Sequence, residues 1–200
     1  MALTSPDWRL RRSGIINLNY SDSVATPSIK GKTWCQNNDI RNCEDLGRLY
    51  TWAAAIDSVT LYNSKAGTCG YGMYGPRICE LPTKVQGICP NGWRLPSKAE
   101  YETLIAVAGG TFIAGKNLKS QRGWDGKGEG ADEIGFSALL AGKYFKGEFY
   151  KGACIWSATD DYTKGAYVIE LNYSNFNEAD IEGVDKSAGE LVRCLLDENQ

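Results

Sequence analysis

The stretch CPNGWRLPSKAEYETL, residues 89–104, constrains the fold of this chain most strongly, because it contains the start of a buried helix. Ser97 and Glu100 have the S-x-x-E spacing of a capping box, in which two side chains satisfy backbone N–H groups of the first turn. Pro96 precedes the cap, where it can pack on the fourth helical residue. An apolar helical face and a closing glycine pair follow: Tyr101, Leu104, Ile105, Ala108, Gly109 and Gly110.

Seven cysteines add a covalent constraint. No pair has C-x-x-C spacing and no histidine is present to complete a zinc site, so disulfides in an oxidising compartment are favoured over reduced thiols. The odd number leaves at least one thiol free or bonded to another chain. Counting alone cannot assign the bridges among Cys35, Cys43, Cys69, Cys79, Cys89, Cys154 and Cys194.

Length and composition indicate one globular domain. The chain has 200 residues, of which 42% are hydrophobic, and this is enough for one sizeable core. We assign residues 1–33 to a lead-in segment and residues 34–200 to the domain. A net charge of -2 gives no basic stripe for nucleic acid, and no apolar run reaches the roughly 20 residues of a membrane span. The start has no signal-peptide pattern, so we expect an exported chain whose leader was removed.

The absence of histidine lowers the expectation of catalysis. Histidine is the usual general base at neutral pH and a common zinc or iron ligand, so a Ser/His/Asp or Cys/His catalytic set is excluded. Carboxylates, tyrosines and thiols remain available for a less common mechanism.

The remaining pattern predicts an α+β domain, with two helices followed by a sheet. A short helix is expected from Trp52 to about Ser58, with Thr51 as its cap, and residues 14–18 can form one edge strand. Aromatic and β-branched residues predict strands at 136–142, 143–152, 154–159, 166–173 and 190–196, the second of them a hairpin over Lys146 and Gly147.

Two glycine-rich segments are predicted to be loops. In CGYGMYGPRIC, residues 69–79, the aromatic side chains either stack on a ligand or pack onto the domain. The segment 115–135 carries four acids that suggest calcium, yet Lys127 and Phe136 occupy positions that an EF-hand reserves for ligands. A solvated acidic loop is therefore favoured over a calcium site, and the acids are Asp125, Glu129, Asp132 and Glu133.

Six motifs together resemble the Fibrobacter succinogenes major paralogous domain, a family of secreted bacterial surface proteins and lipoproteins. They occur in the family's order, and they are CQNNDIRNCEDLGRLYTWAAA (35–55), GICPNGWRLPSKAEYETL (87–104), GKNLKSQRGW (115–124), IGFSALLAGKY (134–144), IWSAT (155–159) and LVRCL (191–195). That family is in turn similar to the C-type-lectin-like superfamily, which includes formylglycine-generating enzymes. RLPSKAEYE is similar to their helix start, and LVRCL is similar to their terminal strand.

The resemblance implies a C-type-lectin-like fold with two helices, a small antiparallel sheet, long irregular loops and chain ends that approach each other. It also implies the bridges Cys35–Cys43 and Cys89–Cys194, since all four positions lie in family motifs. Cys69–Cys79 is expected as the third bridge. Cys154 is then the free thiol.

The resemblance does not bring an enzymatic activity with it. Formylglycine-generating enzymes use two cysteines near the C-terminus, whereas only Cys194 lies in the last part of this chain. Lectins that bind sugar through calcium use EPN or QPD and WND motifs, and these are absent. No cofactor is therefore predicted, and no residue is assigned to a metal.

We expect a non-enzymatic extracellular or cell-surface module that binds a glycan or a protein through its C-terminal loops. Rigid aromatic side chains beside short polar ones are typical of binding surfaces. Each of these residues can equally be an ordinary turn or strand residue. The candidates are Asp160, Asp161, Tyr162, Asn172, Tyr173, Asn175, Phe176 and Asn177, with Trp124 and Tyr74 as secondary ones.

Three alternatives remain open at this point. The Asn- and Tyr-rich run at 160–177 is compatible with a variable binding protein diversified by a retroelement. A structural component of a surface layer or pilus is a second alternative. A thiol-dependent oxidase related to formylglycine-generating enzymes, using Cys194 and another cysteine, is the third.

Overall fold

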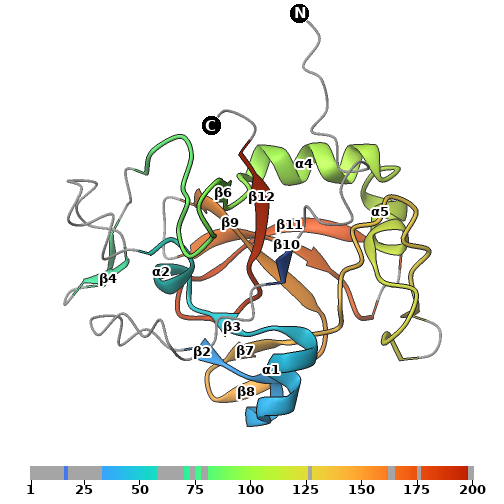
Figure 1. Cartoon of the computed structure of the whole chain (residues 1–200), viewed down its shortest axis with the longest axis horizontal. Coiled ribbons are helices and arrows are strands. Elements are labelled where there is room, and N and C mark those ends of the chain that lie inside the picture. Colours follow the sequence, from blue (N-terminus) through green and yellow to red (C-terminus); the bar gives the residue numbers. More distant parts are fainter. Residues whose placement is uncertain are drawn as a thin grey trace, which may run out of the picture.

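The computed structural model describes residues 16–17, 33–57, 70–72, 75–77, 81–125, 128–161, 165–174 and 177–197. At its centre lies an antiparallel sheet in the order β11-β10-β9 (Figure 1). Its strands are β9 (Ala153–Asp160), β10 (Gly165–Leu171) and β11 (Ala179–Asp185). β9 and β10 confirm two predicted strands. The sequence did not indicate β11, because ADIEGVD has acids and a glycine where a strand usually has β-branched residues.

The helices α4 (Lys98–Val107) and α5 (Thr111–Leu118) pack on one face of this sheet. The predicted capping box is confirmed, because Ser97 Oγ accepts from the N–H of Glu100 and the Glu100 carboxylate accepts from the N–H of Ser97 at 2.8 Å. The glycine pair separates the helices, and Gly110 has a φ of 84° as the N-cap of α5. Within the described residues, no helix is long and apolar enough to cross a bilayer.

The helix α5 corrects the prediction that residues 115–135 form a loop throughout, because it continues to Leu118. Gly115, which suggested a loop, lies inside the helix where it touches the β10–β11 connection. A Cβ atom at this position would lie 2.1 Å from the carbonyl oxygen of Glu178. The glycine is therefore needed for close approach, a reason that is invisible in the sequence.

A second apolar cluster covers the opposite face of the sheet. It contains α2 (Trp52–Ala55), which is shorter than predicted because the chain turns at Ile56 and Asp57 has a φ of 50°. Two buried indoles join β9 to the segment of α2 and of Tyr50, which precedes α2. Trp52 Nε1 donates to Ser157 O at 2.9 Å, and Trp156 Nε1 donates to Tyr50 O at 2.7 Å.

The two ends of the described chain meet in a second antiparallel sheet, in the order β1-β12-β6. Its strands are β1 (Ile16–Asn17), β12 (Arg193–Leu196) and β6 (Trp93–Arg94). β1 lies at an edge of this sheet, as predicted. The disulfide Cys89–Cys194 ties β12 to the segment before β6 and confirms that prediction.

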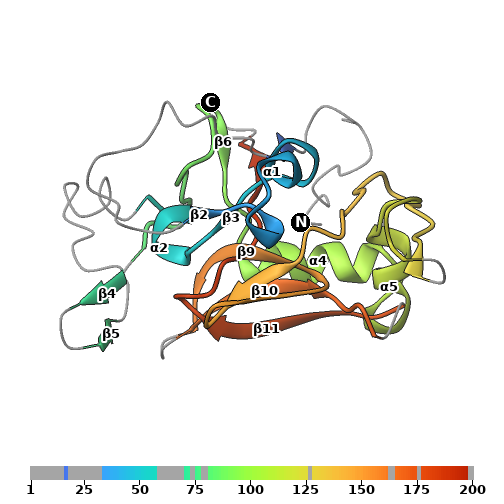
Figure 2. The same ribbon diagram turned by 90° about the horizontal axis from the view of Figure 1, so that it is seen from below.

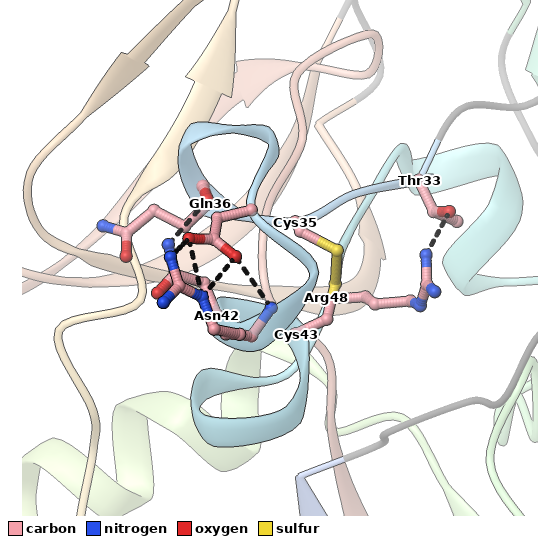
Figure 3. The surroundings of a disulfide bond; sticks show 8 residues. Thr33, Cys35, Gln36, Asn42, Cys43 and Arg48 are labelled. Atoms are coloured by element: carbon pink, nitrogen blue, oxygen red, sulfur yellow. Dashed lines mark hydrogen bonds and ion pairs between the residues drawn. A yellow bond between two sulfur atoms is a disulfide. The ribbon is translucent and has the colours of Figure 1, made fainter.

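A small subdomain follows the lead-in segment. β2 (Thr33–Trp34) pairs with β3 (Leu49–Tyr50), and between them lie η2 (Gln36–Asn38) and α1 (Ile40–Leu46). The disulfide Cys35–Cys43 is confirmed here, and the Asn42 amide donates to Gln36 O at 2.8 Å beside it (Figure 3). The helix α1 begins between these cysteines, where the Asp39 carboxylate accepts from the N–H of Arg41 at 3.0 Å.

Two hairpins complete the described elements. β7 (Lys143–Phe145) and β8 (Glu148–Tyr150) confirm the predicted hairpin, and their turn has positive φ at Lys146 and Gly147. β4 (Gly70–Gly72) pairs with β5 (Gly75–Arg77), so the prediction that residues 69–79 exclude regular strands was wrong. The expected bridge Cys69–Cys79 and the candidate Tyr74 lie outside the described residues.

Residues 189–191 form a seam that joins three elements by backbone hydrogen bonds. Glu190 exchanges two bonds with Tyr50 in β3, and Gly189 exchanges two with Tyr144 in β7. The N–H of Leu191 donates to Cys154 O in β9 at 2.9 Å, and the carbonyl of Leu191 accepts from the N–H of Trp156 in the same strand. The strand predicted at 136–142 is reduced to isolated bridges, since Ala138 pairs with Lys119 and Gly142 pairs with Ala153.

Candidate functional site

The predicted binding residues do not form one surface, because they lie at opposite ends of β10. Asp160 and Asp161 precede this strand, whereas Asn172 and Tyr173 follow it. β10 has seven residues, and at about 3.3 Å per residue its ends lie roughly 20 Å apart. Each end must therefore be judged by itself. Tyr162, Asn175 and Phe176 lie outside the described residues.

The first end is occupied by a buried ion pair. Lys186 Nζ donates to Asp160 Oδ2 at 2.5 Å, and the two side chains are 1% and 3% exposed. The same ammonium lies 4.7 Å from the centroid of the Trp52 ring. Asp160 is thus a structural residue, which corrects its assignment to a ligand surface. Asp161 accepts from the N–H of Gly165 at 3.1 Å and shapes the turn into β10.

The second end carries a half-exposed polar cluster around Tyr173. The Tyr173 hydroxyl donates to Asp125 Oδ2 at 3.1 Å, and Lys151 Nζ bonds the same carboxylate and lies 5.0 Å from the centroid of the tyrosine ring. The bonds from Lys151 and Tyr173 hold the pKa of Asp125 below its usual value. These contacts join three separate chain segments, so they hold an aromatic ring in place at the surface.

A buried layer supports this cluster. Lys119 is completely buried, and its Nζ donates to the Asn172 carbonyl at 2.6 Å while lying 4.4 Å from the centroid of the Trp124 ring. Trp124 is 1% exposed and donates through Nε1 to Ala138 O at 2.8 Å. Trp124 therefore cannot contact a ligand directly, which corrects its assignment. It supports the loop that carries Tyr173.

The neighbouring polar candidates shape the same loop. The side-chain carbonyl of Asn172 accepts from both the N–H and the hydroxyl of Ser174 at 2.8 Å, which closes a local turn. Asn177 is exposed, and its carbonyl accepts from the N–H of Lys116 in α5 at 3.4 Å. We define the Tyr173 surface as the set Asp125, Lys151, Asn172, Tyr173, Ser174 and Asn177.

The acids of residues 115–135 do not gather in the structure. Asp125 is engaged by Lys151 and Tyr173, whereas the Asp132 carboxylate accepts from the N–H of Ser137 at 2.6 Å. Among the residues that the structure describes, no group of three or more acidic or thiol side chains is arranged to hold a metal ion. Asp125 and Asp132 therefore bind neighbouring protein groups.

Sequence reasoning missed Lys119 and Lys151, the two cations of this region. A lysine in a polar segment normally indicates a solvated side chain, and only the tertiary fold buries Lys119 beneath Asn172. A weak signal was available, because Lys119 lies five residues before the only tryptophan of its motif GKNLKSQRGW. Lys151 offered no such signal.

The free thiol is not part of an exposed site. Cys154 is confirmed as a cysteine outside the described disulfides, and it is completely buried in β9. Burial raises the pKa of this thiol well above its usual value, and the carboxylates of Glu190 and Glu170 raise it further. Because the thiolate is the reactive form, Cys154 is expected to be unreactive.

Lys119 gives the loop at 172–174 a predicted pH dependence. Burial lowers the pKa of Lys119 to about 8, whereas the same group in the unfolded chain titrates near 10.4. The folded state then binds fewer protons between these values, so this lysine contributes stability that increases as the pH rises through that window. The amide NMR signals of Asn172 and Ser174 should shift with a midpoint near pH 8.

The control for this titration is Lys119→Arg, because a guanidinium keeps its charge over the whole range. The transition near pH 8 should disappear in Lys119→Arg and in Lys119→Met. An unchanged midpoint in either variant would assign the titration to another group and contradict the prediction.

Among known protein families, the model described as the Fibrobacter succinogenes major domain matches residues 15–195 of this chain. No curated protein and no solved structure matches the chain.

Proposed function

The chain belongs to the Fibrobacter succinogenes major domain family, and from this premise we propose that it is a non-enzymatic extracellular binding or adhesion module. Its ligand, a glycan or a protein, binds on the Tyr173 surface. We also propose the C-type-lectin-like fold for it. The longer helices α4 and α5, the small antiparallel sheets and the pairing of β1 with β12 support that fold, although the described residues also form the short helices α1 and α2, which the prediction of two helices did not include.

The single observation that carries this proposal is the fixed position of the Tyr173 ring. Asp125 and Lys151 hold its hydroxyl from two other segments, and the loop that bears it is anchored from below by Lys119. An aromatic ring that is already immobilised loses little conformational entropy when a ligand packs on it. Asn172 and Ser174 flank Tyr173 in the sequence, Asn177 follows in the same connection, and such polar side chains can adapt their hydrogen bonds to a ligand.

Chemical considerations support binding over catalysis. The sequence contains no histidine, so the most common general base is absent. Cys194, the residue that a thiol-dependent oxidase would need, is 2% exposed and bonded to Cys89. Cys154 is completely buried, and burial raises the pKa of its thiol. These thiols lack the exposed, electropositive setting of reactive cysteines.

The two disulfides support the extracellular location. Cys35–Cys43 and Cys89–Cys194 are compatible with an oxidising compartment, where such bonds form and persist. A cell-surface adhesin would meet its ligand in that compartment.

Tyr173→Ala tests this function after a ligand has been found on a combined glycan and protein array. We expect affinity to fall about tenfold or more, because alanine removes the fixed aromatic contact. Affinity is then measured by biolayer interferometry with the wild-type protein and the variant.

Tyr150→Ala provides a matched control. Tyr150 is an exposed tyrosine at the end of β8 that is not a member of the Tyr173 surface, and its hydroxyl likewise donates to a carboxylate, that of Glu148 at 2.9 Å. Its removal should change affinity by about twofold at most. If binding survives Tyr173→Ala, or if both variants lose it equally, the proposed surface is wrong.

A further inference from the structure

The outer edge of the strand β11 pairs with no other strand in the described part of the chain. Each of its seven residues pairs with β10 on one side. On the other side, none of the residues that the structure describes forms a backbone hydrogen bond with positions 179–184. Figure 2 shows β11 along the border of the sheet, with no helix or strand beyond it. The backbone N–H and C=O groups of this edge are a template for another strand.

Carboxylates crowd the face of the sheet beside this edge. Glu170 lies directly opposite Asp180, and Glu182 occupies the next position on the same face of β11. We call these three residues the acidic edge. Like charges on directly opposite positions repel, so this arrangement is unfavourable without a cation.

Among the residues that the structure describes, Lys143 supplies a counter-charge to the acidic edge. Lys143 Nζ donates to Glu170 Oε1 at 3.1 Å. Partial burial raises the pKa of Glu182, and the nearby charge of Glu170 raises it further, so the single lysine does not neutralise the group.

We propose that β11 binds an extended, lysine- or arginine-bearing segment of a partner protein, which adds to the sheet as a further strand. The partner's backbone would pair with the outer edge of β11. Its alternate side chains would then place cations over Glu170, Asp180 and Glu182. This interaction surface is separate from the Tyr173 surface and goes beyond the function proposed above.

The partner is not a second copy of this chain. Two β11 strands placed edge to edge would bring Asp180 and Glu182 of one copy close to the same carboxylates of the other. This adds repulsion rather than relieving it.

The probe is a fluorescein-labelled peptide with the sequence TKTKTKT, which has the length of β11. We expect it to bind the whole protein in an anisotropy titration at low salt, about tenfold more tightly than the neutral peptide TQTQTQT. The same lysine peptide carrying N-methyl groups on alternate residues keeps its charge but cannot pair as a strand, and it should bind about tenfold more weakly.

Glu182→Lys reverses an exposed charge of the acidic edge and should weaken binding of the lysine peptide about tenfold. Glu133→Lys, which changes an exposed acid outside the sheet, is the matched control and should alter affinity by about twofold at most. Tyr173→Ala should have no effect here, so this test is independent of the proposed function. The proposal would be overturned if the lysine peptide did not bind, if its N-methyl form bound equally well, or if Glu182→Lys bound the lysine peptide fully. Dimerisation through β11 in analytical ultracentrifugation would also overturn it.

Discussion

Replacing Cys89 and Cys194 together by alanine should lower the free energy of unfolding by about 4 to 5 kcal/mol. These residues are 105 positions apart in the sequence, so their bond restricts more than half of the chain in the unfolded state. In the chain-entropy description, a loop of this size corresponds to about 4.7 kcal/mol at 25 °C. Urea unfolding of the wild-type protein and the double variant, followed by far-UV circular dichroism, measures the difference.

The second disulfide provides the matched control. Cys35 and Cys43 are 8 positions apart, and the same description gives their bond about 2.5 kcal/mol. The double alanine variant at Cys35 and Cys43 should therefore lose about 2 kcal/mol less than the variant at Cys89 and Cys194. Equal losses, or a larger loss for the short loop, would contradict the prediction and show that local packing outweighs chain entropy.

Glu190→Gln should stabilise the protein at neutral and mildly alkaline pH. Glu190 is buried in the seam of residues 189–191, and its Oε2 atom lacks a hydrogen-bond partner among the described residues. Burial raises the pKa of this carboxyl well above its ordinary value; Lys143 opposes the effect and Glu170 adds to it. Glutamine has nearly the same shape and does not ionise.

The direction of the pH dependence follows from proton binding. Because the folded-state pKa of Glu190 is raised, its contribution to stability is fully present below about pH 4.3 and is lost as the pH rises toward the folded-state value. Each pH unit between the two values costs about 1.4 kcal/mol at most. The wild-type protein and Glu190→Gln should therefore have similar stability near pH 4, and the wild-type protein should become progressively less stable than the variant as the pH rises.

Thermal and urea unfolding over this pH range measure that divergence. Glu102→Gln is the control, since Glu102 lies on α4 with its side chain 56% exposed, and its curve should parallel that of the wild-type protein. A Glu190→Gln variant that is less stable than the wild-type protein at pH 8 would show that Glu190 is ionised and stabilised by Lys143.

Features with a local cause were predictable from the sequence. The capping box at Ser97 and Glu100 needs only four consecutive residues, and the hairpin turn at Lys146 and Gly147 needs only its own backbone. The family resemblance added the two described disulfides, which counting of cysteines could not assign.

Features that depend on distant partners were not predictable. Gly115 suggested a loop, but it lies inside α5 because the carbonyl of Glu178 comes too close for a Cβ atom. β11 has an acidic sequence and becomes a strand through its ladder with β10. In both cases a contact between segments outweighs local propensity.

The candidate binding residues also differ in whether the sequence could predict their role. Tyr173, which is half-buried, was predictable, because an aromatic ring among Asn and Ser residues is typical of binding loops. Trp124 and Asp160 have the same residue types as surface candidates, yet Trp124 is 1% exposed and Asp160 is 4% exposed. Composition indicates what a side chain can do, whereas burial decides which side chains can reach a ligand.

Residue types and short spacings were enough to predict the α+β class, the start of α4 and the family. They also exclude chemistry that uses histidine, since the sequence contains none. The folded structure was needed to show that the predicted loops lie at opposite ends of β10 and that Lys119 anchors the Tyr173 loop. It was also needed to show that the acidic edge lies beside a border of the described sheet. These outcomes arise from the pairing and burial of residues far apart in the chain. A side chain's partners, and therefore its charge state and its access to ligands, are set only when those segments meet.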